Sequence, residues 1–300
     1  MKTSWPLDRD VLGRLTIGWP TEYKWHPGTH FWVEPILNGM LSHGVRVERR
    51  PVPQPYPDIV MIEVDAGRGP RLVAIDYGDH VDVNAEAAEA SVAYFKLQYP
   101  VAGSPHTTVL PGGYMCANPI IYRRLAVLRA LRGRPRFSYD VYGRWGLRVA
   151  SEIRERAFEI LSSRKDFRYE GNLFRYAGGP DKVPYKRYLF EITRAKVCVD
   201  MPGAGDLTFR LVDYLALGAC VVRPLGDSQL HVPLVDGQHV VYCAADLSDL
   251  ADVCARLVRD ELERERVARA GRDYFDRFLH PRQLAAYYLF EICKAIGPSG

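Results

Sequence analysis

The residues best suited to chemistry lie in the stretch 196–222, where a glycine-containing turn joins an apolar run to a helical pattern. Residues 196–200 predict a β-strand, residues 207–217 a helix, and the apolar residues after Gly218 a second strand. A strand, turn and helix in this order expose free backbone N–H groups at the positive end of the helix dipole. Gly203 and Gly205 would let the backbone approach a ligand closely. The stretch therefore predicts a phosphate-binding site.

Two charged residues of the expected helix, Arg210 and Asp213, are three positions apart and would share one side of it. The buried face would then consist of Leu211, Val212 and Leu215. A cation near the helix start could hold a diphosphate, and a carboxylate one turn later could hold the two hydroxyls of a ribose. An exposed ion pair on an ordinary strand-helix-strand unit explains the same spacing equally well.

The string FRLVDYLALGACVV at 209–222 resembles the donor-site signature of GT-B glycosyltransferases, in particular the exostosin-like and spore-maturation-like groups. The likeness is good over 197–222 and loose over 137–279. It implies a UDP-, GDP- or dTDP-sugar donor, with Asp213 contacting the ribose and Arg210 lying near the phosphates. Together with the turn residues and the match described next, the predicted donor-binding residues are Gly143, Arg144, Arg148, Gly203, Gly205, Thr208, Arg210 and Asp213.

A second match lies at 139–148, where the first strand of the nucleotide domain is expected to turn into its first helix, facing the cleft. Arg144 and Arg148 are four positions apart, so both could face one anion. The resemblance implies that Arg144 stabilises the leaving diphosphate. The alternative is a pair of surface arginines beside an ordinary turn.

The resemblance also bears on stereochemistry. Retaining GT-B enzymes typically carry two acidic residues eight positions apart, the second of which touches the ribose. The residue eight positions before Asp213 is Gly205, and Asp206 is one position off. The sequence therefore favours inversion.

An inverting transfer needs a base for the acceptor hydroxyl, and the N-terminal domain of such enzymes usually supplies it from a loop. Two loops contain suitable side chains. Asp79 and His26 are the leading candidates, followed by Glu22 and His30.

The run Asp79 to Asp82 could instead suggest a metal, because His and Asp are metal ligands. A metal site needs three or four convergent ligands, and no D-x-D motif follows a strand of the donor domain. We therefore expect metal-independent catalysis, in which arginines and the helix dipole neutralise the departing diphosphate. No cofactor is expected, since the nucleotide sugar is a co-substrate.

The elements that must position these residues follow a pattern that occurs twice. Short apolar runs alternate with helical patterns, which predicts an α/β fold of two Rossmann-like parallel-sheet domains. Strands are expected at 15–19, 45–48, 59–64 and 72–76 in the first half, with a helix at 31–42, and at 137–142, 167–170, 196–200, 219–222 and 239–242 in the second. The GT-B resemblance implies that the two domains face a cleft, with the last helix, after Pro281, packing back across it.

The arginine-rich segment 121–136 ends with Gly133 and Pro135 and marks the expected domain boundary. Residues 1–133 would form the acceptor domain and residues 134–300 the donor domain. The segment is either a linking helix that packs through Ile121, Leu125 and Leu128 and exposes its arginines to water, or a docking surface for a membrane or an acidic carrier protein. The arginines are Arg123, Arg124, Arg129, Arg132, Arg134 and Arg136.

Composition agrees with this class. A net charge of +4 over 300 residues is mildly basic, which suits a small anionic ligand better than nucleic acid. The sequence shows neither a secretory signal nor a run of ~20 apolar residues. The six cysteines have no C-x-x-C spacing and are expected to be buried thiols, so we expect a cytoplasmic protein.

Three functions remain open at this stage. The first is a hexosyltransferase-type enzyme that moves a sugar from a nucleotide donor to a small-molecule or carrier-linked acceptor. The second is a non-hydrolysing sugar-nucleotide epimerase. The third is a non-catalytic sugar-nucleotide-binding protein.

Overall fold

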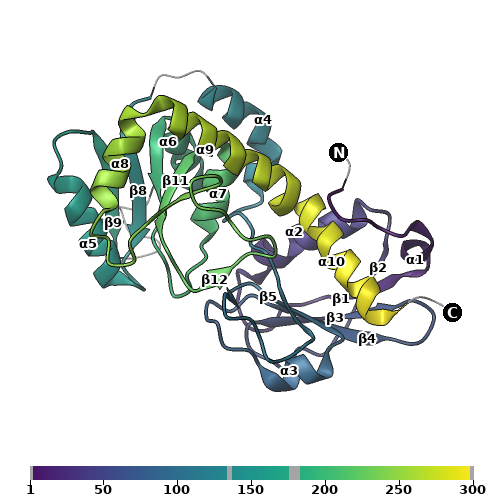
Figure 1. The fold of residues 1–300 in the computed structure, drawn as a ribbon. Helices are drawn as coiled ribbons and strands as arrows, with labels where there is room; N and C mark the ends of the chain where they lie inside the picture. The colour runs from purple at the N-terminus through teal and green to yellow at the C-terminus, as the bar shows by residue number, and fades with distance from the viewer. Residues whose placement is uncertain (1–2, 134–136, 176–182, 298–300) are drawn as a thin grey trace. The chain divides into compact units, whose positions relative to one another are not determined.

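A computed structural model describes residues 3–133, 137–175 and 183–297 (Figure 1). The chain forms two compact units. Unit 1 consists of Met1–Met115, Ser228–Pro233 and Arg277–Gly300, and unit 2 consists of Cys116–Asp227 and Leu234–Asp276.

This division differs from the predicted boundary between residues 133 and 134. Helix α4 (Ile120–Arg132) belongs to unit 2, and the last helix, α10 (Pro281–Ile296), belongs to unit 1. The boundary moves because the buried side of α4, formed by Ile121, Leu125 and Leu128, packs against α6 and α7 of unit 2.

Unit 1 is an α/β unit whose six-stranded sheet has the order β2-β1-β3-β4-β5-β7. The strands are β1 (Thr16–Pro20), β2 (Arg46–Arg50), β3 (Ile59–Asp65), β4 (Arg71–Asp76), β5 (Ala93–Lys96) and β7 (Val109–Pro111). Its helices are α1 (Arg9–Arg14), α2 (Thr29–Leu41), α3 (Ala85–Ala90) and α10, and a short pair joins β6 (Tyr99–Pro100) to β12 (Ser228–Gln229).

The sequence predicted a parallel sheet for unit 1. The sheet is mixed instead, because β3 runs antiparallel to both β1 and β4. Only five residues link β3 to β4, and a parallel connection needs about a dozen or more. Gly67 and Gly69 have φ of 91° and 92° in this link. The side chain of Asp65 accepts hydrogen bonds from the N–H groups of Gly67, Arg68 and Gly69. The loop is therefore a tight hairpin.

Helix α10 packs on α2 within unit 1. Gly39 of α2 allows this close approach, because a Cβ there would collide with the carbonyl oxygen of Pro281. Tyr288 of α10 stacks on Phe95 of β5 with 3.8 Å between the ring centroids. The C-terminal helix thus completes the core of unit 1.

Unit 2 contains a fully parallel five-stranded sheet with the order β13-β11-β10-β8-β9. The strands are β8 (Tyr139–Gly146), β9 (Tyr169–Phe174), β10 (Ala195–Val199), β11 (Cys220–Pro224) and β13 (Val241–Cys243). The helices are α4, α5 (Ser151–Ser163), α6 (Tyr185–Thr193), α7 (Phe209–Leu217), α8 (Leu250–Arg259) and α9 (Glu261–Tyr274). The predicted α/β class and the predicted strands of both halves are confirmed.

Helix α4 is the arginine-rich segment of the sequence. Its three predicted packing residues are buried, and Arg123 and Arg124 are exposed. The side chains of Arg129 and Arg132 do not point only into solvent, because both donate hydrogen bonds to other elements of unit 2. Arg134, Pro135 and Arg136 lie outside the described residues.

Five of the six cysteines are buried and all six are free thiols. Within the described part of the chain, none of the helices is both long and apolar enough to cross a bilayer.

Candidate anion-binding site of unit 2

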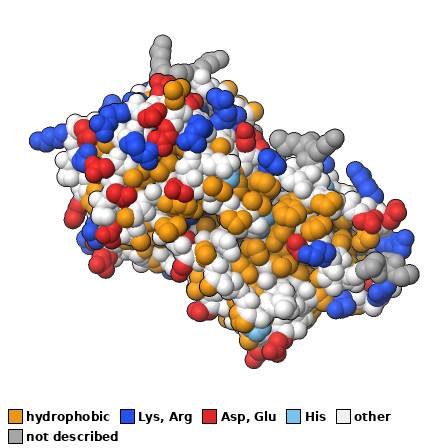
Figure 2. Space-filling model, in the orientation of Figure 1, with side chains coloured by type: hydrophobic (Ala, Val, Ile, Leu, Met, Phe, Trp, Pro, Cys, Tyr) orange, Lys and Arg blue, Asp and Glu red, His pale blue; other side chains and the backbone are white. Residues whose placement is uncertain are grey.

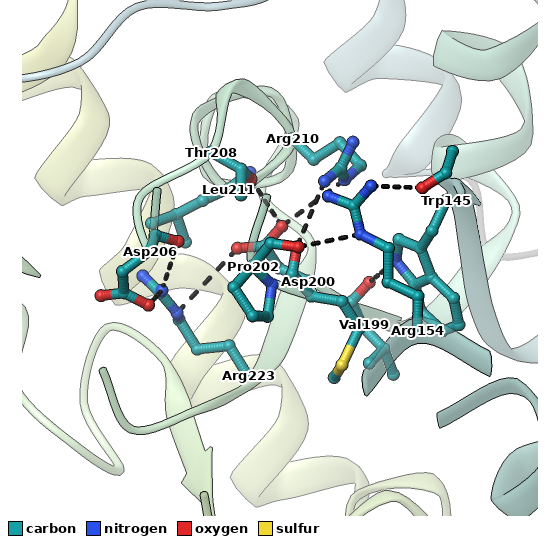
Figure 3. Close-up of polar contacts among 12 residues, drawn as sticks. Trp145, Arg154, Val199, Asp200, Pro202, Asp206, Thr208, Arg210, Leu211 and Arg223 are labelled. Carbon is teal, nitrogen blue, oxygen red and sulfur yellow. Dashed lines mark hydrogen bonds and ion pairs between the residues drawn. The ribbon is translucent and has the colours of Figure 1, made fainter. Parts of the chain in front are cut away.

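The predicted phosphate site lies at the carboxyl ends of β10 and β11, where the loop after β10 leads into α7 (Figure 3). Thr208 caps α7, since its Oγ1 accepts from the N–H of Leu211 at 3.2 Å. Gly218 ends the helix in the left-handed region with φ of 72°. Parallel strands commonly place ligand sites at this edge.

Asp200, directly after β10, is fully buried at this edge. Its Oδ1 accepts from Thr208 Oγ1 at 2.6 Å and lies 3.7 Å from Nε of Arg210. Its Oδ2 lies 3.9 Å from Nε of Arg223 on β11. Figure 3 shows the two guanidinium groups on either side of the carboxylate. One buried carboxylate is therefore shared by two buried cations.

A third buried arginine, Arg154 of α5, lies beside this cluster. It donates to the carbonyl oxygen of Pro202 at 2.8 Å and to that of Gly146. Burial, together with the positive charge of Arg210, lowers the pKa of Arg154 to about 10. Burial is the larger of these two causes, and the negative charge of Asp200 opposes them.

Arg223 also binds Asp206 in the loop, with 2.6 Å between its Nη2 and Asp206 Oδ1. Three arginines thus face two carboxylates, Asp200 and Asp206, which leaves one positive charge in excess. The first N–H groups of α7 lie at the same place. The arrangement can bind an anion above the loop.

Arg210 and Asp213 do not form an ion pair with each other. Both are buried, which excludes the exposed ion pair. Arg210 turns to Asp200 and donates to the carbonyl oxygen of Met201 at 3.1 Å. Asp213 has a different set of partners. The spacing placed both side chains on one side of α7, but burial against separate neighbours draws them apart.

Asp213 accepts hydrogen bonds from the N–H of Ala117 at 3.2 Å and from the hydroxyl of Tyr185 at 3.0 Å, both at Oδ1. Its Oδ2 is buried without an N–H or O–H donor among the described residues, and the thiol of Cys116 is a further neighbour that lowers the pKa of this carboxyl. Burial raises the pKa of Asp213 to about 7, and the bonds from Tyr185 and Ala117 offset only part of this.

This raised pKa predicts how stability depends on pH. The unfolded carboxyl ionises near its ordinary pKa of 3.8 and the folded one near 7, so the folded state binds more protons between these values. The contribution of Asp213 to stability is present below about pH 4 and is lost as the pH rises to about 7. Asp213→Asn should therefore gain stability relative to the wild type over this range, by a few kcal/mol at about 1.4 kcal/mol per pKa unit.

Urea titrations of both proteins between pH 4 and 8 measure this difference. A stability difference that stays constant with pH would contradict the prediction.

The structure corrects the prediction for 139–148. Gly143 and Arg144 lie inside β8 rather than in a turn toward a helix, because the strand extends to Gly146. A Cβ at Gly143 would collide with the ring of Trp145, so this glycine serves packing. Arg148 lies in the exposed loop after the strand, so Arg144 and Arg148 are not on one helix.

Arg144 is buried and is already engaged by acidic side chains. Its guanidinium lies 2.8 Å from Glu191 and 2.8 Å from Glu170. The surface-arginine alternative is therefore wrong for Arg144. Its two carboxylate partners satisfy its charge within unit 2.

The turn glycines lie where the sequence predicted, in the loop between β10 and α7. The N–H of Gly203 donates to the carbonyl oxygen of Gly205 at 2.8 Å, which closes the turn. A Cβ on Gly203 would touch the guanidinium of Arg154 at 3.4 Å. The loop backbone thus lies directly on the arginine cluster.

The predicted base candidates lie in unit 1, on the loop before α2 and on the loop after β4. Tyr77, at the end of β4, contacts Thr29 and Trp32 at the start of α2. Asp79 is exposed and accepts from the hydroxyl of Tyr114 at 3.1 Å. His26 is exposed, and its Nδ1 accepts from the N–H of Gly28 at 2.9 Å. The ring of Trp32 lies between His26 and Tyr77, at 5.1 Å and 5.2 Å from their centroids.

Glu22 and His30 are also exposed on the first of these loops. The described residues contain no group of three or more His, Cys, Asp or Glu side chains that could hold a metal ion.

The sequence did not single out Arg154, Arg223 or Asp200 as site residues. Asp200 and Arg223 each follow an apolar run at the end of a strand, and a charge in that position is the available signal. Arg154 shares the buried face of α5 with Ala157 and Leu161, at spacings of three and seven. An arginine on an otherwise apolar helix face could have identified Arg154 as a buried charge.

Comparisons with known proteins identify the family of this chain. Residues 123–289, more than half of the chain, match a family model described as glycosyl transferase-like. No curated protein matches the chain significantly.

Three solved structures resemble parts of this chain. WaaG, a glycosyltransferase involved in lipopolysaccharide biosynthesis, is 12% identical over 62% of this chain and 57% of its own, with a TM-score of 0.41. Anabaena HepE in complex with UDP-glucose is 14% identical over 61% and 57%, with a TM-score of 0.39. A glycosyltransferase from Rickettsia africae is 10% identical over 59% and 45%, with a TM-score of 0.34.

The chain matches less than two thirds of the length of each of these structures. The family assignment rests on the family model, whose matched region includes the whole of the arginine cluster and α7. This chain belongs to the glycosyl transferase-like family, as the donor-site resemblance predicted.

Proposed function

We propose that the protein is a GT-B glycosyltransferase of the hexosyltransferase type. It would transfer a sugar from a nucleotide-sugar donor to a small-molecule or carrier-linked acceptor. The observation that carries the proposal is the cluster of Arg154, Arg210 and Arg223 around Asp200, at the N-terminus of α7 in the region matched by the family.

The chemistry of transfer explains why such a cluster is useful. The bond between the anomeric carbon of the sugar and a diphosphate oxygen breaks, and negative charge grows on the leaving nucleoside diphosphate. Buried cations and free N–H groups that are already in place stabilise this charge without reorganising. The excess positive charge of the cluster supports metal-independent departure, with the nucleotide sugar as co-substrate and no other cofactor.

Asp213 is proposed to bind the ribose of the donor. Its Oδ2 has no N–H or O–H donor among the described residues, which supports a role as acceptor for a ribose hydroxyl. Tyr185 bonds to the other oxygen and would hold the carboxylate in place for the ligand. Arg144 is not part of the proposed diphosphate site, because Glu170 and Glu191 neutralise it.

Nucleotide binding tests the proposal directly. UDP, GDP and dTDP are each added to the protein in the presence of EDTA, and thermal unfolding is followed. One of them should stabilise the protein by about 2.7 kcal/mol when present at 100 times its dissociation constant. Absence of stabilisation by all three, with or without Mg²⁺ or Mn²⁺, would overturn the proposed donor site. A requirement for metal would overturn only the metal-independent part.

Turnover separates the enzyme from the alternatives. Release of the nucleoside diphosphate that depends on an added acceptor indicates transfer. An altered nucleotide sugar formed without acceptor would indicate an epimerase, and binding without any turnover would indicate a sensor.

Inversion requires a base, and we propose Asp79, with His26 as the second candidate. Asp79→Asn should lower kcat by about 10²–10⁴-fold while leaving donor affinity within a factor of about two, because a general base acts in the transition state. Asp82→Asn, on the same exposed loop, is the matched control. Normal turnover in both Asp79→Asn and His26→Gln would exclude both residues as the base.

A further inference from the structure

A second cationic site lies at the opposite end of α7 from the arginine cluster, within unit 2. A hollow of about 200 Å³ adjoins Leu217 and Gly218, where α7 ends. Five arginines and one aromatic ring line it, namely Arg129, Arg132, Arg264, Arg269, Arg272 and Phe137. Glu265 is the single acidic residue in this lining. In Figure 2, basic side chains gather over the part of unit 2 that carries α9, mixed with acidic ones.

Two of these arginines hold helix ends together. Arg132 donates to the carbonyl oxygens of Gly218, Ile192 and Ala195 at 2.6–2.9 Å. Arg129 donates to the carbonyl oxygen of Ala216 at 2.7 Å. Satisfying the last carbonyl groups of α6 and α7 is a structural task.

Arg129 also forms two parallel bonds to the carboxylate of Asp276, at 2.8 and 2.9 Å. Its charge is therefore neutralised. The other arginines of the lining, Arg264, Arg269 and Arg272, are not neutralised by a carboxylate in this way.

Arg264 is buried, and its Nη1 donates to the carbonyl oxygens of Leu257 and Val258 at 3.0 Å. Its Nε is also buried but has no acceptor among the described residues. The nearest carboxylate, on exposed Glu261, is 3.8 Å away. A buried guanidinium donor without an acceptor is costly unless an anion satisfies it.

Arg269 and Arg272 have no comparable structural task. Among the described residues Arg269 forms no hydrogen bond or ion pair, and Arg272 approaches only the neighbouring Asp273, at 3.6 Å. The ring of Phe137 lies 5.8 Å from the guanidinium of Arg132 and 5.9 Å from that of Arg264. The hollow therefore has an aromatic wall and a surplus of positive charge.

We propose that this pocket binds the phosphate group of an anionic ligand. Arginine suits a phosphate because its planar fork presents two parallel N–H groups to two oxygens. Pockets for drug-sized ligands measure ~300–1,000 Å³, so this smaller hollow suits one phosphate group rather than a whole nucleotide. The site is separate from the donor site and does not rest on the proposed function.

The phosphate could be free or carried by a lipid. Val127 and Leu131 of α4 are 64% and 40% exposed, on the same helix as Arg129 and Arg132. Neither side chain lines the pocket, so the test includes both a free and a lipid-linked phosphate.

The test measures binding by the full-length protein. The soluble probes are inorganic phosphate and dihexanoyl phosphatidic acid, titrated by calorimetry, and the lipid probe is phosphatidylcholine vesicles with and without phosphatidic acid, in a sedimentation assay. The test variant is the double substitution Arg269→Gln/Arg272→Gln. The matched control is Arg156→Gln/Lys165→Gln, which removes the same charge from exposed positions outside α4 and outside the pocket. Arg210→Ala tests the donor site.

We expect the pocket variant to weaken binding at least tenfold and the control to stay within about twofold. Binding of inorganic phosphate indicates a free phosphate ligand. Binding of dihexanoyl phosphatidic acid, or of vesicles that contain phosphatidic acid, without binding of inorganic phosphate indicates a lipid-linked one. Either result supports the pocket if the pocket variant loses it. Equal weakening in the two double variants would mean that only net charge matters, which would overturn the proposal. Loss of binding in Arg210→Ala alone, or no binding of any probe, would also overturn it.

Discussion

Replacing Asp200 with alanine is expected to lower the free energy of unfolding by about 3–5 kcal/mol, the cost of leaving buried charges without their partner. Asp200 is fully buried between Arg210 and Arg223. Without it, Thr208 Oγ1 loses its acceptor and two guanidinium groups face each other in a region that also holds Arg154.

Urea unfolding at neutral pH measures this effect. Glu155→Ala is the control, since Glu155 is an exposed acidic residue of α5 in the same unit. A loss of less than about 1 kcal/mol, typical of exposed ion pairs, would show that the arginines do not depend on this carboxylate.

Arg210→Ala is expected to weaken the binding of nucleoside diphosphate by about ten- to a hundredfold, while the nucleoside alone binds almost as before. Arg210 is the buried cation on α7 itself, next to the free N–H groups of the helix. A hydrogen bond to a charged group contributes about 1.5–3 kcal/mol, which corresponds to this change in affinity.

Titrations of the variant with nucleoside diphosphate and with nucleoside separate the two contributions. Arg156→Ala removes the same charge from an exposed position of α5 and should leave both affinities unchanged. Equal weakening of both ligands by Arg210→Ala would indicate a distorted fold. Unchanged affinity for both would remove Arg210 from the proposed site.

The sequence was a good guide to the elements of unit 2 because its strands are short apolar runs between amphipathic helices. The start of α7 could be predicted to within two residues, since Thr208 and the glycine turn mark it. The direction of β3 was missed, although the short link with Gly67 and Gly69 contains the information. A link of that length allows only an antiparallel neighbour.

The candidate site was harder to predict because its side chains come from separate parts of the chain. Arg154, Asp200 and Arg223 lie on α5, after β10 and on β11, and only the parallel sheet brings them together. Local spacing could place Arg210 and Asp213 on one helix. It could not show that one bonds to Met201 and the other to Tyr185.

Gly143 shows that a glycine in a sequence need not mark a turn. The family match placed a turn toward a helix within 139–148, but β8 contains Gly143 and extends to Gly146. The room that Gly143 leaves is filled by Trp145, which packs in the core of unit 2. Tight packing of an aromatic ring and a change of chain direction both select glycine, and the sequence alone does not distinguish them.

The assembly of unit 1 from three separate segments has a consequence for how the protein is made. Helix α2, which ends at Leu41, obtains its partner only when α10, which begins at Pro281, has left the ribosome about 240 residues later. At ~5–20 residues per second, this leaves the apolar side of α2 without α10 for roughly 10–50 s of synthesis. Unit 2 is encoded almost entirely within that interval, so its core can form before unit 1 is closed. Chaperones that bind exposed apolar helices should therefore associate with nascent chains that end between residues 115 and 277, and release them once α10 is complete.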